Sequence, residues 1–259
     1  MQKNKILSLI TFFIISTITF LSADDIHNPK SVLTEVMNRM AGIDQTFKID
    51  MVQQQKGKPD VKRQFISQTH WPEEGDVEKQ IRMDYLFPKE MKGVIFWEHR
   101  FLDRSYKRWR TMPVTGKLQD LSDISENKMK GNGFQFSDLE VTPELIETHQ
   151  HQIVGNELIL GKNTLIIEIQ KKEKSKRDGK MRLWIDPENN IILKVIFYNH
   201  RDRELTVIQC TELGTVDDLL FYKMIKVENK KKKLNIEIKL SELSIARITD
   251  SQQFIPAGK

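Results

Sequence analysis

Leu234-Asn235-Ile236-Glu237-Ile238-Lys239-Leu240-Ser241 alternates apolar and polar residues without exception. Successive side chains of an extended chain point to opposite faces, so this strand has one apolar face and one polar face. The pattern is typical of an antiparallel sheet with one dry face and one hydrated face. Something in the molecule must therefore cover the dry face.

Similar extended segments fill most of the chain before this strand. They are separated by short turns such as Asp178-Gly179 and His200-Arg201-Asp202, which suit hairpins and are too short for parallel crossovers. The expected strands fall at 47–51, 61–70, 81–87, 94–98, 101–106, 109–112, 164–170, 181–186, 191–198, 204–213, 219–228 and 234–240. We therefore predict a mainly β protein with a few helices, built as an unclosed antiparallel β-barrel of about eleven strands.

Two regions depart from the strand pattern and predict helices. Asn28 and Pro29 form a helix start, an apolar stripe follows from Val32 to Met40, and Gly42 ends it. Between 113 and 149, residues 119–127 suggest a short helix, and Ser137 with Glu140 suggests a capping box that opens another. We expect these helices to form a lid over an apolar cavity on the dry face of the sheet.

The N-terminal residues read as a secretory signal peptide. Lys3 and Lys5 precede an apolar stretch that ends in Leu21-Ser22-Ala23, and a polar chain begins at Asp24. The apolar stretch is short for a membrane span, although an uncleaved anchor is the alternative. Cleavage after Ala23 would leave residues 24–259 as a single exported domain, with no cysteine at the cleavage site to take a lipid. We expect a periplasmic protein that is not lipid-anchored and has no transmembrane segment.

Composition narrows the function further. A formal net charge of +5 over 259 residues is too mild for a nucleic-acid binder. The single cysteine, Cys210, excludes an intramolecular disulfide and lies in an apolar strand, where inert burial is expected. The chain carries no nucleophile elbow, P-loop or paired-cysteine metal site. His149 and His151 are weak metal-ligand candidates, so we expect neither enzymatic activity nor a cofactor.

Basic runs and aromatic residues leave alternatives open. The runs 171–177 and 230–233 are either solvated hairpin tips or contacts for an acidic partner or anionic membrane surface. Aromatic residues gather in the middle of the chain, where they form either an ordinary core or the lining of a pocket under the lid.

Two motifs in the middle of the chain resemble those of a known family. Gly131-Asn132-Gly133-Phe134-Gln135-Phe136-Ser137-Asp138-Leu139 is similar to the G-S-D-F-S-Y-E-D-L segment of the LolA-like proteins, the outer-membrane lipoprotein-sorting family. Leu183-Trp184-Ile185-Asp186-Pro187-Glu188-Asn189, followed by Leu193-Lys194-Val195, resembles the L-W-I-D hairpin of that family. The order and spacing agree from about Ser31 to Ile248.

The resemblance implies a carrier that binds the acyl chains of a lipoprotein or lipid and passes them towards the outer membrane. Its implied partners are an inner-membrane donor complex and an outer-membrane acceptor, and we expect a monomer. An envelope-stress or transporter-associated sensing module of the same fold is the alternative. The residues expected to line the lipid-binding cavity are Val36, Met40, Phe96, Trp109, Phe134 and Phe136.

Overall fold

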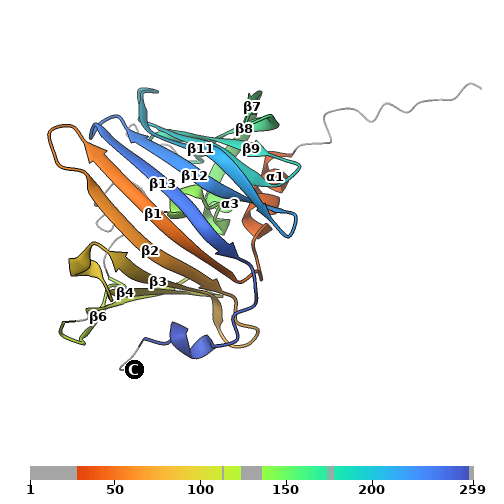
Figure 1. Cartoon of the computed structure of the whole chain (residues 1–259). Helices are drawn as coiled ribbons and strands as arrows, with labels where there is room; N and C mark the ends of the chain where they lie inside the picture. The colour runs from red at the N-terminus through yellow and green to blue at the C-terminus, as the bar shows by residue number, and fades with distance from the viewer. Residues whose placement is uncertain (1–27, 113, 124–135, 174, 176–177, 257–259) are drawn as a thin grey trace, which may run out of the picture.

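The structure, a computed structural model, describes residues 28–112, 114–123, 136–173, 175 and 178–256. Within these residues thirteen strands form one antiparallel sheet in the order β6-β5-β4-β3-β2-β1-β13-β12-β11-β10-β9-β8-β7 (Figure 1). The strands are β1 (Gln45–Gln55), β2 (Val61–His70), β3 (Val77–Phe87), β4 (Ile95–Phe101), β5 (Tyr106–Thr111), β6 (Leu118–Asp120), β7 (His149–Ile159), β8 (Lys162–Lys171), β9 (Lys180–Asp186), β10 (Ile191–Tyr198), β11 (Glu204–Val216), β12 (Leu219–Asn229) and β13 (Leu234–Ser244). The predicted mainly β, unclosed antiparallel architecture is confirmed, with thirteen strands where about eleven were expected.

The centre of the sheet joins the first strand of the chain to the last. Ile49 of β1 pairs with Leu240 of β13, and Met51 pairs with Ile238. The strands therefore run outward from this centre in two meanders, β1 to β6 and β13 back to β7. β6 ends at Asp120 on one edge of the sheet, and β7 begins at His149 on the other. Residues 136–148, the crossing segment, lie between these two edge strands in the chain.

The helices lie on the concave face of the sheet, behind it in the view of Figure 1. Helix α1 (Pro29–Asn38) begins as predicted, because the Oδ1 of Asn28 accepts a hydrogen bond from the backbone N–H of Lys30 at 2.9 Å. Its Val32 and Leu33 are buried against the sheet. A turn with Gly42 at a φ of +75° follows the helix, a conformation that glycine adopts without strain.

The crossing segment carries the 3₁₀ helix η3 (Phe136–Leu139) and helix α3 (Pro143–Thr148). A short helix was predicted here with Ser137 as its cap; Ser137 instead lies inside the 3₁₀ helix η3, and the α-helix of this segment begins later, at Pro143. Thr142 caps it instead, its Oγ1 accepting from the N–H of Leu145 at 3.2 Å, with Pro143 in the first turn. Val141 and Ile146 of this segment are buried in the main core.

The main core lies between the concave face and these helices. It contains the apolar faces of the central strands, including Ile49, Ile208, Ile225, Ile236 and Ile238. The alternating pattern of β13 is confirmed, because its apolar residues from Leu234 to Ile238 are buried and its intervening polar residues are exposed.

The opposite, outer face of β2 to β5 is covered by the end of the chain. The 3₁₀ helix η4 (Ser251–Phe254), the blue helix at the bottom of Figure 1, packs beside β3 and β4. Another 3₁₀ helix, η2 (Lys89–Met91), lies between β3 and β4 in the chain. Phe254 is fully buried and stacks on His70, with ring centroids 5.2 Å apart. His99 donates from Nε2 to the carbonyl of Phe254 at 2.9 Å, and Trp97 donates from Nε1 to that of Gln253 at 3.1 Å. Residues 245–256, the C-terminal strap, thus close a second, outer core.

A buried carboxylate fastens the start of this strap. Asp44 accepts from the N–H of Ile248 and of Trp71, each at 2.8 Å, and from Nδ1 of His70 at 3.0 Å. Burial alone would raise the pKa of Asp44, but these donors hold it below its usual range.

Three further elements differ from the sequence prediction. The strand expected over 101–106 is absent, because residues 102–105 form the turn between β4 and β5. Residues 118–120 form edge strand β6, where a helix over 119–127 was expected. Strand β7 was not assigned, because its sequence is rich in Gln, His, Gly and Asn and carries few β-branched residues. No helix in the part of the chain that the structure describes is long and apolar enough to span a membrane.

Candidate functional site

A cavity of about 630 Å³ lies between the concave face of the sheet, the end of α1 and the crossing segment. This volume falls in the range of ordinary small-molecule sites. Its apolar lining comes from elements far apart in the sequence. The residues are Val36, Met37, Met40, Phe47, Ile81, Met83, Phe136, Leu139, Val141, Ile191, Ile192, Val216, Phe221, Leu240 and Leu243.

The helical side of the cavity is formed by α1, the turn after it and η3. Val36 lies in the last turn of α1 and continues the stripe that buries Val32, and Met40 follows in the turn after the helix; both line the cavity. Phe136 approaches from η3 and meets Phe47 of β1 edge to face, with ring centroids 6.5 Å apart. The cavity is therefore bounded by a helix, a strand and the crossing segment at once.

Arg39 fixes the end of α1 to the other half of the sheet. Its Nε donates to the carbonyl of Asn189 at 2.9 Å, and its guanidinium also donates to the carbonyl of Leu220. The guanidinium lies 6.0 Å from the ring centroid of Phe221. Burial lowers the pKa of Arg39, but a guanidinium stays charged throughout the physiological range. Arg39 thus joins α1 to the β9–β10 and β11–β12 turns at the rim of the cavity.

Tyr222 closes the wall beside Arg39. Its hydroxyl donates to the carbonyl of Ile192 at 2.9 Å, which satisfies the one polar atom of a buried ring. Burial raises the pKa of Tyr222 above its usual value, so the phenol is neutral. This part of the lining presents apolar surface to any occupant.

The opposite end of the cavity is charged. Arg100 of β4 donates to Glu98 at 2.8 Å and to Glu140 of the crossing segment at 2.6 Å. Nζ of Lys79 lies 3.5 Å from the other oxygen of Glu140, and Nε of Arg108 donates to Glu98 at 2.7 Å. Burial alone would raise the pKa of both carboxyls, but their basic neighbours hold each below its usual range. Lys79, Arg100 and Glu140 line the cavity, as does Glu78, and Glu98 and Arg108 lie behind them. The cluster of Lys79, Arg100, Arg108, Glu98 and Glu140 is ionised and is called the cationic end of the cavity.

The structure brings three of the six expected cavity residues together. Val36, Met40 and Phe136 line the cavity. Phe96 pairs with Met83, which lines the cavity, but Phe96 itself does not. Phe134 lies outside the described residues.

Trp109 is placed on the other side of the sheet. It pairs with Trp97, whose indole is held by the C-terminal strap, and its ring packs edge to face on His99 at 5.0 Å. Its side chain is 2 % exposed. The aromatic content of β4 and β5 therefore serves the outer core as well as the cavity side. Both faces of β4 and β5 are covered, so both carry apolar residues. The sequence pattern therefore does not show which face lines the cavity.

The histidine pair and the cysteine were the other candidates for chemistry. Oγ1 of Thr148 lies 2.8 Å from Nδ1 of His149, and Nε2 of His151 lies 3.0 Å from the carbonyl of Leu145. The described residues contain no group of three or more potential metal ligands. Cys210 is buried as expected, and burial raises its pKa to about 11.

Sequence reasoning missed the cationic end and Arg39. Lys79, Arg100 and Glu140 come from separate segments, so their spacing in the chain carries no motif. The available signal for Lys79 and Arg100 was their position in strands next to apolar residues, where a charge must find a partner.

Comparisons with known proteins agree with this architecture. A family model described as an uncharacterized protein matches residues 78–256. A domain from Vibrio parahaemolyticus described as an outer membrane lipoprotein-sorting protein superposes with a TM-score of 0.69 at 18 % identity, over 87 % of this chain and 95 % of that chain. A DUF1329 family protein from Desulfovibrio piger gives a TM-score of 0.68 at 15 % identity, over 86 % and 92 % of the two chains. A LolA superfamily protein from Nitrosomonas europaea gives 0.60 at 13 % identity, over 87 % and 96 %. No curated protein matches the sequence.

Proposed function

Because the chain belongs to the LolA-like family, we propose that it is an envelope carrier, not an enzyme, that binds acyl chains of a lipid or lipoprotein in its cavity. The observation that carries this proposal is the apolar lining of a 630 Å³ cavity enclosed between sheet and helices. Residues 3–23, with their basic start and apolar run, support export to the periplasm. The proposed route runs from an inner-membrane donor to an outer-membrane acceptor.

The energetics of acyl burial require the cavity to be limited in size. Each buried CH₂ contributes about 0.8 kcal/mol, so full enclosure of several long chains would make release impossibly slow. A cavity of 630 Å³ encloses only part of such a cargo. Partial enclosure keeps binding reversible and allows transfer down a gradient of affinity without a nucleotide or metal.

Native mass spectrometry of protein purified without detergent tests the proposal. The expected spectrum contains an adduct with the mass of a lipid or acylated peptide. The same protein should accelerate transfer of an acyl probe between labelled donor and acceptor vesicles. A spectrum of apo-protein together with an unchanged transfer rate would refute the carrier role.

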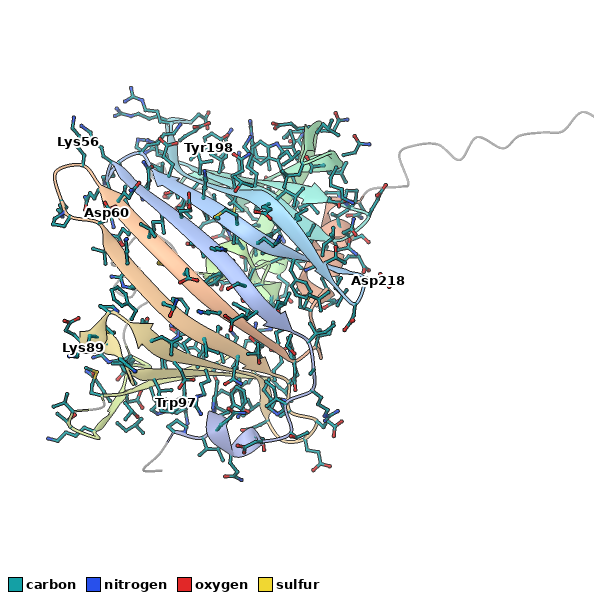
Figure 2. The ribbon with its side chains drawn as sticks, in the orientation of Figure 1. Lys56, Asp60, Lys89, Trp97, Tyr198 and Asp218 are labelled. Carbon is teal, nitrogen blue, oxygen red and sulfur yellow. The ribbon has the colours of Figure 1, made fainter. Side chains whose placement is uncertain are left out.

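Charge at the two ends of the sheet favours the sensing module as a second candidate. Loops at one end are basic and loops at the other are acidic; Figure 2 shows Lys56 and Asp218 at opposite ends. At one end the exposed basic loop residues Lys56, Lys58, Lys89, Lys92, Lys117, Lys172, Arg201, Arg203 and Lys230 to Lys233 outnumber the exposed acidic residues Asp60, Glu90, Glu173 and Asp202. At the other end the exposed acidic loop residues are Glu73, Glu74, Asp76, Asp103, Glu188, Asp217 and Asp218, with Arg104 as an exposed basic residue among them. Such a surface would dock on an acidic partner and orient the protein on it.

Charge reversal separates this candidate from the carrier. Replacing Lys231, Lys232 and Lys233 by Glu should abolish pulldown of an envelope partner and leave acyl binding intact. Reversal of Lys226 and Lys239, which are exposed on the outer strand face, is the control. Equal pulldown by both variants would show that the basic loops are only solvated turns.

A further inference from the structure

The cationic end of the cavity has hydrogen-bond donors to spare. Lys79 lines the cavity with a side chain that is only 14 % exposed. An ammonium group carries three donors, and the carboxylate of Glu140 at 3.5 Å is its hydrogen-bond and ion-pair partner among the described residues. Charge-assisted bonds are normally 2.7–2.9 Å long, so this contact is a loose one.

A neighbouring donor has no acceptor at all in the described part of the chain. The indole Nε1 of Trp71, another residue of the cavity wall, is buried and unpaired. Nζ of Lys79 lies 5.5 Å from the centroid of the same ring. Buried donors without acceptors are rare in native proteins, and each calls for an explanation.

The electrostatic environment of Lys79 also favours a bound anion. Burial lowers its pKa below the usual value, and Glu140 only partly offsets that effect, because Arg100 competes for the same carboxylate and repels the ammonium. A further anion beside Lys79 would remove this penalty. Glu140 belongs to the crossing segment, so it acts as an internal anion that a ligand would have to compete with.

We propose that the Lys79 and Arg100 end of the cavity binds the anionic head, a carboxylate or phosphate, of an acyl lipid. The head group accepts hydrogen bonds from Lys79 Nζ, and the tail lies along the apolar wall formed by Val36, Met83 and Phe136. This inference rests on the proposed acyl-binding function and specifies the class of ligand. The hydroxyl or ester oxygen of a neutral lipid would offer Lys79 an uncharged and therefore weaker acceptor, so such a lipid should bind less tightly.

Two probes with the same tail test the head-group preference directly. Oleate and oleyl alcohol are titrated into the native protein below their aggregation limits at pH 8, with calorimetry as the readout. We expect oleate to bind about tenfold more tightly than the alcohol. Inorganic phosphate alone should not bind at millimolar concentration, because it lacks the tail. Binding of phosphate as tight as that of oleate would overturn the proposal in favour of a free-anion site.

Three variants test whether the preference for oleate arises from Lys79 and its partner Glu140. Lys79→Met should weaken oleate binding about tenfold and leave oleyl alcohol unchanged, and Lys79→Arg should restore most of the preference. Glu140→Gln removes the competing carboxylate and should strengthen oleate binding, an opposite sign that a purely structural role would not produce. Lys194→Met is the matched control. Lys194 also makes a 3.5 Å ion pair, lies over a tryptophan ring and is 18 % exposed, but it is not part of the cavity wall.

The possible results distinguish failure of the head-group site from failure of the acyl-binding function on which it rests. Equal affinity of the native protein for oleate and oleyl alcohol would overturn the head-group site while acyl binding stands. An equal decrease in affinity for oleate and oleyl alcohol in Lys79→Met would also overturn the head-group site. Absence of binding by either tail would refute the acyl-binding function as well. The comparison of the two probes on the native protein holds even where a variant fails to fold.

Discussion

Nη1 of Arg100 donates to Oε2 of Glu140 across 2.6 Å, and this bond ties the crossing segment to the wall of the sheet. Both side chains are less than one-third exposed, so the pair is partly shielded from solvent. The bond links strand β4 to the residue that directly follows η3, the 3₁₀ helix that carries Phe136.

A double-mutant cycle should measure this link. Arg100→Met and Glu140→Gln are each expected to lower the free energy of unfolding, with a coupling of about 1–3 kcal/mol between them. Lys48→Met and Glu242→Gln, an ion pair on the sheet surface, form the control cycle with a coupling near zero. Urea denaturation of the four variants of each cycle supplies the values. Equal couplings in the two cycles would contradict a shielded tie.

The stabilisation from the Arg100–Glu140 pair should decrease as the pH falls. The pKa of Glu140 is held low in the folded protein, although burial alone would raise it, because Lys79 and Arg100 stabilise the carboxylate. Its stabilisation is therefore fully present above the unfolded pKa of about 4.3 and is lost as the pH falls through the lower folded value. The Arg100 coupling measured at pH 7 should shrink at pH 3. A coupling that grows on acidification would contradict the assignment.

Filling the cavity should block binding without unfolding the protein. Val36→Trp projects a large ring into the apolar lining and is expected to abolish binding of a fluorescent acyl probe, while far-ultraviolet circular dichroism stays unchanged. Overpacking costs about 1–3 kcal/mol, which thermal melting should register. Val154→Trp, at a 41 % exposed position on β7, is the control and should bind normally. Normal binding by Val36→Trp would place the acyl site elsewhere.

The C-terminal strap should contribute to stability through one side chain. Phe254→Ala removes a fully buried ring that stacks on His70, at an expected cost of about 3–5 kcal/mol. Ile255→Ala, one residue further along and 48 % exposed, should cost less than about 0.5 kcal/mol. Chemical denaturation gives both numbers. Similar losses for the two variants would mean that the strap is not held by Phe254.

Cys210 should report on global unfolding. Its pKa of about 11 leaves roughly one thiol in a thousand ionised at pH 8, and the side chain is buried. Modification by a thiol reagent should therefore be slow in the native protein and rapid in denaturant. Fast native labelling would show that β11 opens locally.

The sequence predicts the sheet far better than it predicts the site. Strict alternation from Leu234 to Leu240 and the Asn28–Pro29 cap are local signals, and both are confirmed. The start of α3 at Thr142 and Pro143 was not predicted, and the Ser137–Glu140 pattern lies instead at the 3₁₀ helix η3. Which short turn of this segment becomes an α-helix depends on packing that only the folded chain defines.

The placement of Trp109 shows why the site was harder to predict. Assigning a strand residue to the cavity face requires knowing which face is dry, and here the C-terminal strap makes the outer face dry as well. The strap reaches β4 through contacts more than 150 residues apart in the chain. No window of local sequence contains that information. Lys79, Arg100 and Glu140 are related in the same non-local way.

The pairing of β1 with β13 also sets the timing of folding. Ile49 cannot meet Leu240 until nearly the whole chain has been synthesised, so the central seam of the sheet can close only near the end of synthesis. Chains dominated by such distant contacts fold slowly. Until this seam closes the two meanders cannot complete their shared core, and a chain without a complete core is easier to thread through a narrow protein-conducting channel than the finished fold.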